Sequence, residues 1–284
     1  MQSQTFSEAW DASTHLLADR FLIRDWDADL PWHEVVPDAL SREAHLLPVV
    51  LELAQLDDVQ RAFLQTHLVM ADTRDPGPAM LLSSDLGVTA LARELSRHVV
   101  VTLADASRAM LRMADPQVFV QLLWILPLPY LASLCHAARR WWIPFSGQWH
   151  ELGFHERPAP QWEALPEDPS IALSNVGLIN QVLRTLPEPD GLKAFWRTSQ
   201  HCNQWLRTAQ AEAGLAAADD CVAYARHGVV LGKLFSSHPV LASCLQGARE
   251  TPGLYAQRTA SMSDREWDRV IADIEEIKRK QEAA

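Results

Sequence analysis

The sequence predicts an α+β protein, with an N-terminal α/β lobe over residues 1–155 and an all-helical lobe over residues 156–284. Short β-branched and aromatic runs separated by turn residues occur before about residue 155, and helical periodicity dominates after it. Between the lobes, Arg157-Pro158-Ala159-Pro160 begins a proline-rich link. Because strands alternate with helices in the first lobe, we expect a mixed sheet covered by helices.

The first part of the N-terminal lobe is predicted to contain short strands and helices. Phe21–Trp26 and Leu46–Ala54 are strand candidates, and Met80–Leu82 reads as a short buried strand. The other predicted elements are a helix over Val59–Val69 capped by Asp57-Asp58, a loop at Asp75-Pro76-Gly77-Pro78, and a helix from Asp85 to Arg97 with Ser84 or Asp85 as its N-cap.

Two hairpins are predicted in the second part of this lobe. Val99–Leu103 and Ala109–Met113 flank a polar connection. The aromatic-rich runs Trp141–Ile143 and Gln148–Leu152 bracket Phe145-Ser146-Gly147, where glycine suits a turn.

Between the hairpins, the Asp115-Pro116 step predicts the start of a helix. Asp is favoured as an N-cap, and Pro is favoured at the first helical position. We therefore expect Asp115 at a helix N-terminus and Pro116 in the first turn.

Helical segments account for the rest of the chain, with Pro187, Pro189 and Gly214 as stops. No convincing strand occurs beyond residue 155. The predicted helices are Asn175–Leu186, Gly191–Ala213, Ala217–Phe235, Pro239–Ala248 and Asp264–Lys280.

Composition excludes several classes of function. The net charge of −11 disfavours nucleic-acid binding, which depends on clustered Lys and Arg. The N-terminus lacks the basic and apolar regions of a secretory signal, and the longest apolar run, Val118–Leu134, is interrupted and too short to span a membrane. Four isolated cysteines are typical of free buried thiols in a reducing compartment. We therefore expect a cytoplasmic protein without membrane contact.

Catalytic and ligand-binding motifs are weak in this sequence. Ser83-Ser84 follows a strand, but the sequence around it lacks the glycines of a nucleophile elbow. His150 and His155, beside Glu151 and Glu156, are the nearest approach to a metal cluster, and zinc requires three or four converging ligands. The acidic alternation of Asp25, Asp27 and Asp29 lacks the spacing of a calcium loop, and no phosphate-binding loop occurs. We expect no enzyme activity, no metal and no cofactor.

The order of motifs resembles the effector adaptor or chaperone proteins of bacterial type VI secretion. The resemblance runs roughly from Leu46 to Pro239. Ala114 and Gln117 stand where the family usually has an aromatic residue and an arginine. The segments that carry the resemblance are Leu81-Leu82-Ser83-Ser84, Leu95-Ser96-Arg97-His98, Arg112-Met113-Ala114-Asp115-Pro116-Gln117-Val118, Arg140-Trp141-Trp142-Ile143-Pro144, Gly147-Gln148-Trp149, and Tyr224-Ala225-Arg226 with Gly232, Phe235 and His238-Pro239.

The resemblance implies a protein that binds a cognate toxic effector and helps to load it onto the spike protein VgrG. The family motifs Ser83, Ser84, Asp115, Pro116, Trp142 and Trp149 are then structural. Trp is enriched among interface anchors, so Trp196 and Trp205 are the candidate effector-binding residues, with core packing as the alternative. Two other hypotheses remain open, namely a structural cytoplasmic component of another secretion machine and an uncharacterised hydrolase using Ser84 or a site near His150.

Overall fold

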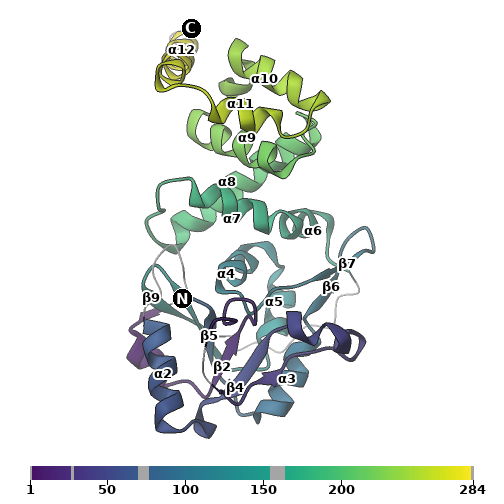
Figure 1. The fold of residues 1–284 in the computed structure, drawn as a ribbon, viewed down its shortest axis with the longest axis vertical. Helices are drawn as coiled ribbons and strands as arrows, with labels where there is room; N and C mark the ends of the chain where they lie inside the picture. Colours follow the sequence, from purple (N-terminus) through teal and green to yellow (C-terminus); the bar gives the residue numbers. More distant parts are fainter. Residues whose placement is uncertain (1, 27–28, 70–76, 154–163, 283–284) are drawn as a thin grey trace. The chain divides into compact units, whose positions relative to one another are not determined.

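The computed structural model describes residues 2–26, 29–69, 77–153 and 164–282. The chain divides into two compact units, Met1–Leu173 and Ser174–Ala284. The first contains the sheets, and the second is helical (Figure 1). The fold class is therefore confirmed, while the exact lobe bounds at residues 155 and 156 stay a prediction.

A seven-stranded antiparallel sheet is the centre of the first unit, in the order β1-β9-β8-β5-β2-β4-β3. Both of its edge strands, β1 and β3, are very short, which limits pairing with other chains. The strands are β1 (Gln2–Gln4), β2 (His15–Ala18), β3 (His33–Glu34), β4 (Val49–Glu52), β5 (Ala79–Ser83), β8 (Arg140–Phe145) and β9 (Gln148–Gly153).

The predicted mixed sheet is wrong in one respect, because every strand pairing described is antiparallel. The helix α2 (Asp58–Val69) lies in the connection from β4 to β5, and these two strands run parallel to each other, because both are antiparallel to β2. They are not neighbours, however. β2 lies between them and pairs antiparallel with both.

Both predicted hairpins are confirmed with slightly different bounds. β6 (Val100–Thr102) and β7 (Arg108–Met110) form a separate two-stranded sheet. β8 and β9 are joined through Ser146 and Gly147, which both have positive φ, at 51° and 69°. Two left-handed residues in succession match the twist of a tight hairpin, and glycine adopts that conformation without steric cost.

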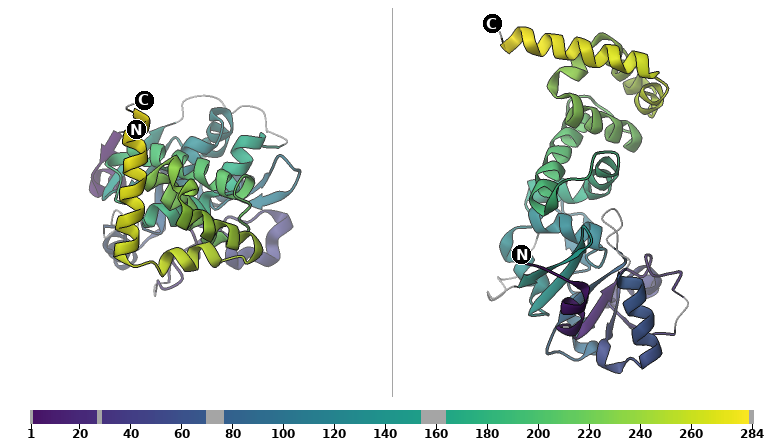
Figure 2. Two further views of the ribbon diagram at one scale, coloured as in Figure 1. Left: turned by 90° about the horizontal axis from the view of Figure 1, so that it is seen from above. Right: turned by 90° about the vertical axis from the view of Figure 1, so that its left-hand side faces the viewer.

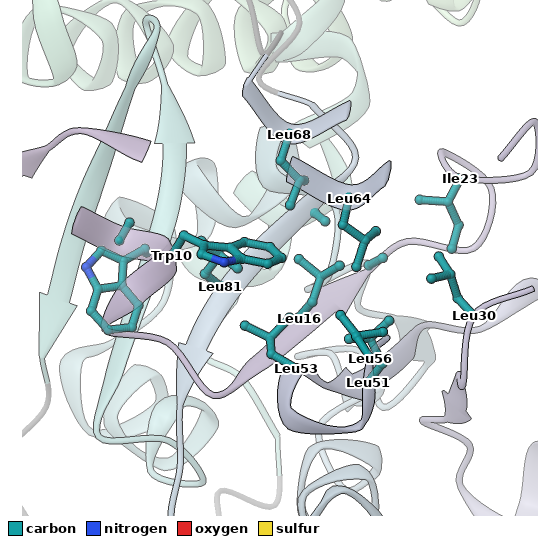
Figure 3. Packing of buried hydrophobic residues seen from close by; sticks show 14 of the residues in the cluster. Trp10, Leu16, Ile23, Leu30, Leu51, Leu53, Leu56, Leu64, Leu68 and Leu81 are labelled. Atoms are coloured by element: carbon teal, nitrogen blue, oxygen red, sulfur yellow. The ribbon is translucent and has the colours of Figure 1, made fainter. Parts of the chain in front are cut away.

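One hydrophobic core lies between the sheet and the helices α1 (Phe6–Asp11) and α2. Leu16, Leu51 and Leu81 point from three neighbouring strands toward Leu64 and Leu68 of α2 (Figure 3). The opposite face of the sheet is also covered. There Trp141 stacks on Phe119, at 5.1 Å between ring centroids, and donates its indole N–H to the Cys135 carbonyl at 3.0 Å.

Two local predictions in this unit are wrong. Phe21–Trp26 forms turns, because Asp19 accepts hydrogen bonds from the backbone N–H groups just after β2. The helix predicted from Asp85 begins at Val88 with Gly87 as its N-cap. Neither Ser84 nor Asp85 caps it. In the predicted loop Asp75-Pro76-Gly77-Pro78, the first two residues lie outside the described part of the chain. The remaining helices of this unit are α3 (Val88–Ser96), α4 (Pro116–Ile125), α5 (Leu128–Cys135) and α6 (Glu167–Ser174), with the 3-10 segments η1 (Asp38–Leu46) and η2 (Leu53–Gln55).

The second unit is built from helices alone in its described part, as predicted (Figure 2). Gly232, with φ of 79°, ends α9 and divides the segment predicted as one helix into α9 and η3. The short helix α11 was not predicted. The elements are α7 (Val176–Arg184), α8 (Gly191–Ala211), α9 (Ala218–Leu231), η3 (Lys233–Ser237), α10 (Pro239–Glu250), α11 (Leu254–Ala260) and α12 (Asp264–Glu282).

Cys135, Cys202, Cys221 and Cys244 are all buried and free, as predicted. Among the described helices, none combines the length and the apolar character that crossing a bilayer requires.

Candidate functional site

A groove in the helical unit contains one of the two tryptophans singled out in the sequence. It consists of two adjoining hollows of about 400 and 460 Å³, which share Glu212, Tyr224 and Ser236. Trp205 lines the first hollow, and Arg249 lines the second. The walls come from α8, α9, η3 and α10, all within the second unit. We call this feature the Trp205 groove.

Aromatic packing fixes the apolar wall of the groove. The rings of Trp205 and Tyr224 meet edge to face at 6.0 Å, and both contact Phe235, at 5.6 and 4.8 Å between centroids. Phe235 is fully buried, whereas Trp205 is only half-buried. Such edge-to-face contacts hold large rings in defined positions. The groove therefore has a rigid aromatic wall, in which the half-buried ring of Trp205 packs against the buried ring of Phe235.

Close approach of α8 and α9 is possible because Gly228 faces the indole. A Cβ at this position would lie 2.2 Å from Cδ2 of Trp205, which no packed structure tolerates. The indole N–H donates to Nε2 of His201 at 3.0 Å, so His201 carries its proton on Nδ1 when neutral. Burial raises the pKa of the Tyr224 hydroxyl, which stays protonated at neutral pH.

Polar groups form the rim of the groove. The Arg249 guanidinium donates to the carbonyls of Ala213 and Glu212, at 2.9 and 3.4 Å, and so satisfies backbone acceptors at the end of α8. Gln204, Lys233 and Gln246 are exposed around the opening. An aromatic wall with a polar rim is the arrangement found in protein-binding sites.

Residues 22–133 match the family model of a domain of unknown function, DUF4123. The chain contains a DUF4123 domain. This domain begins after β2 and extends into α5, entirely within the first unit. No curated protein and no solved structure matches the chain. The Trp205 groove lies outside the DUF4123 match.

The Asp115-Pro116 motif of the DUF4123 domain has the predicted geometry. Asp115 is the N-cap of α4 and accepts from the backbone N–H groups of Gln117 and Val118, at 2.9 and 3.4 Å. Arg112 donates to Asp19 at 2.9 Å and lies 3.3 Å from Asp115. Burial raises the pKa of the Asp115 carboxyl, although Arg112 opposes this shift. Asp19 directly follows β2, a strand that was not predicted, and no motif in the sequence indicated its ion pair with Arg112.

The two serines at the end of β5 have structural contacts. Ser83 ends the strand and pairs with Arg140. Ser84 is buried, donates its hydroxyl to the Ala137 carbonyl at 2.6 Å and accepts from the Leu86 N–H at 3.2 Å. These bonds replace the helix-capping role that the sequence predicted for Ser84.

The two motif tryptophans of the second hairpin are buried. The indole N–H of Trp142 donates to the Gln4 side chain at 2.8 Å, and Trp149 packs against Phe6 at 5.7 Å between ring centroids. Both therefore attach the N-terminal strand and α1 to the hairpin.

The remaining sequence candidates are not brought together with the groove. Trp196 is half-buried on α8, nine residues before Trp205, and does not line either hollow. His150 lies on β9, and its neighbour Glu151 accepts from Gln4. His155 and Glu156 lie outside the described residues. Within the described ranges, no three His, Cys, Asp or Glu side chains converge in a way that suits a metal ion.

Proposed function

We propose that this protein is a type VI secretion effector adaptor, which binds a cognate toxic effector non-covalently and promotes its loading onto VgrG. The Trp205 groove supports a binding role, because it offers a half-buried aromatic anchor within a polar rim. The motifs that resemble the adaptors, from Leu81 through the Asp115-Pro116 step, fall within the DUF4123 match. We assign the effector to the groove and expect a partner side chain to pack against Trp205.

The first test of this proposal is stoichiometric complex formation. The purified protein should form a stable complex with the product of an adjacent toxin gene, and deleting the adaptor should abolish delivery of that toxin alone. Other toxins of the same system should still be delivered, because each adaptor selects its cargo by a difference in affinity. Absence of any complex, or a general loss of secretion, would contradict the proposal. General loss would indicate a core component of the machine.

The second test locates the effector in the groove. Gln204→Trp places a bulky side chain at the exposed rim beside Trp205, and Gln257→Trp adds the same side chain to exposed α11 outside the groove. We expect the first variant to weaken the effector complex by about tenfold or more, since blocking a central anchor costs at least ~1.4 kcal/mol. The second should bind like the wild type. Equal affinities for both variants would exclude the groove as the effector site.

A further inference from the structure

A further hollow lies in the first unit, between the edge strand β3 and the helix α3. Its volume is about 560 Å³, larger than either hollow of the Trp205 groove. α3 packs against β3 and β4, so the hollow lies at the edge of the seven-stranded sheet. We call this feature the β3–α3 hollow. Its strand side lies within residues 33–38, and its helix side is one face of α3, formed by Thr89, Ala92, Arg93, Ser96 and Arg97.

The backbone of β3 has one bonded side and one open side. β3 pairs antiparallel with β4 in a register that puts Glu34 opposite Val49. The next residue, Val35, donates its N–H to the Pro48 carbonyl at 2.9 Å, so the main-chain groups of Val35 point toward β4. These groups alternate in direction along a strand, so the N–H and C=O of Glu34 point away from β4. Neither group has a hydrogen bond within the described part of the chain.

The open side of β3 adjoins the hollow. Glu34 and Val36 are two residues apart in an extended segment, and both line the hollow. Glu34 is exposed, and Val36 is partly exposed. The chain stays extended up to Pro37, which has φ of −65° and ψ of 143°. The main chain at the sheet edge is therefore accessible where the hollow leaves room for side chains.

Opposite charges balance in the hollow, although the unit as a whole is acidic. Residues 1–173 contain 12 Lys and Arg against 23 Asp and Glu. The hollow is lined by two guanidinium groups, of Arg93 and Arg97, and by two carboxylates, of Glu34 and Asp38. Glu34 is also paired with Arg20, at 3.0 Å. Because neither sign of charge dominates, the open main-chain groups are the feature that selects a ligand here.

We propose that the β3–α3 hollow binds an extended segment of a partner protein, which pairs with β3 as an additional strand of the sheet. The main-chain groups of Glu34 would bond to those of the segment, and alternate side chains of the segment would enter the hollow along α3. In this mode of recognition, main-chain bonds give affinity and pockets for alternate side chains give specificity. β3 is too short to hold a strand by main-chain bonds alone, so the hollow completes the site.

This surface is separate from the one proposed for the effector. Both sides of the hollow lie within the DUF4123 match, whereas the Trp205 groove lies in the helical unit. The chain would therefore carry two binding surfaces, one on each unit. The inference does not rest on the proposed function.

The test selects a random peptide library displayed on phage against the full-length protein, with counter-selection on Thr89→Trp. Thr89 is exposed on α3 and lines the hollow, so an indole at this position fills it. The counter-selection removes peptides that bind elsewhere, including those in the Trp205 groove. Enriched peptides should be rich in β-branched and aromatic residues, which favour extended strands.

The affinity of a synthetic copy of the most enriched peptide is then measured by fluorescence anisotropy. Thr66→Trp is the matched control, because it makes the same substitution at an exposed position on α2, outside the hollow. The peptide should bind Thr66→Trp like the wild type and bind Thr89→Trp about tenfold more weakly or worse, a loss of ~1.4 kcal/mol.

A second pair of variants tests the main-chain pairing and does not alter α3. Glu34→Pro removes an N–H that points away from β4, and proline is tolerated at such an edge position. Glu34→Ala keeps the N–H and, like the proline variant, removes the carboxylate that pairs with Arg20. We expect the peptide to bind Glu34→Pro about three- to tenfold more weakly than Glu34→Ala, the usual effect of one lost hydrogen bond.

Three results would overturn the proposal. The first is no enrichment over the counter-selection, or enrichment of proline-rich peptides, which lack main-chain donors. The second is equal affinity of the enriched peptide for Thr89→Trp and Thr66→Trp. The third is equal affinity for the two Glu34 variants, which would exclude strand pairing. Because the library contains no gene neighbours, none of these results depends on the effector complex.

Discussion

At the scale of single residues, Asp115 has two roles. It caps α4, and its carboxylate lies within reach of Arg112, which also binds Asp19. We predict that Asp115→Ala lowers the free energy of unfolding by about 0.5–2 kcal/mol, the usual effect of losing an N-cap. The measurement is urea unfolding of the first unit at neutral pH. An unchanged midpoint would contradict the capping role.

Asp115→Asn separates the cap from the charge. Asn keeps an oxygen that can accept from the Gln117 N–H, and Asn caps helices about as well as Asp. Burial raises the pKa of the Asp115 carboxyl, because the charged form loses solvation in the folded protein. Removing the charge removes this desolvation cost. We therefore predict a smaller loss in Asp115→Asn than in Asp115→Ala. An equal loss in the two variants would mean that the ion pair with Arg112, and not the cap, accounts for the contribution of Asp115.

His227 makes the helical unit sensitive to acid. Burial lowers its pKa to about 4, and its Nδ1 lies 2.7 Å from the Tyr255 hydroxyl. In the unfolded chain the pKa is about 6.5, so protons bind preferentially to the unfolded state between these values. Stability is therefore complete above pH ~6.5 and falls as the pH drops toward 4, by up to about 2 kcal/mol from pH 7 to pH 5.

The corresponding variant is His227→Gln, which cannot titrate in this range. We expect it to flatten the dependence of stability on pH between 7 and 5 for the helical unit, whatever its effect at neutral pH. Burial also lowers the pKa of His98 to about 4, and His98 lies in the other unit. The pH dependence of that unit should therefore be unchanged in the variant, which provides an internal reference. An unchanged slope in the helical unit would exclude His227 as its source.

At the scale of elements, the packing of α8 on α9 depends on Gly228. Alanine is normally favoured over glycine within a helix by about 1 kcal/mol. Here the new methyl group would overlap the Trp205 ring, and overpacking typically costs about 1–3 kcal/mol. We predict that Gly228→Ala is destabilising overall and weakens effector binding, because the indole must shift.

Gly177 provides the matched substitution. It lies in α7, and a Cβ there would meet nothing within 4 Å. Gly177→Ala should be neutral or slightly stabilising, by at most about 1 kcal/mol. Thermal unfolding of the two variants in parallel is the measurement. Equal destabilisation by both would mean that the contact with Trp205 is not the cause.

The elements that the sequence predicted are those specified by neighbouring residues. The β8–β9 hairpin has its turn at Ser146-Gly147, and α4 has its start at Asp115-Pro116. β2 and β3 have only four and two residues, and their stability comes from pairing with distant strands. The sequence around a short strand does not indicate with which distant strand it pairs. The same reason explains why Phe21–Trp26 was predicted as a strand in place of His15–Ala18.

The candidate surfaces were predictable to different degrees. Trp205 was identified because tryptophan is enriched at interfaces, but the groove also requires Tyr224, Phe235 and Arg249 from three later elements. The role of Gly228 was not predictable, since its contact with the indole depends on how two helices pack. Trp26 and Phe63 meet across 37 residues of sequence, so their proximity was not predictable.

At the scale of the whole molecule, each unit has its own core. Leu81 is fully buried in the sheet of the first unit, and Leu206 is fully buried on α8 of the second. Truncation of a buried leucine to alanine costs about 2–5 kcal/mol through lost contacts and a residual cavity. The two substitutions should therefore report on separate parts of the protein.

We predict that calorimetry of the full chain resolves two unfolding transitions. Leu81→Ala should lower the temperature of one transition, and Leu206→Ala should lower the other, because each cavity affects only the unit that contains it. A single transition lowered equally by both substitutions would show that the units unfold together.

The dependence of the two transitions on salt provides an independent assignment. Raising ionic strength should stabilise mainly the transition lowered by Leu81→Ala, since charge repulsion is concentrated in the unit with 23 acidic and 12 basic residues.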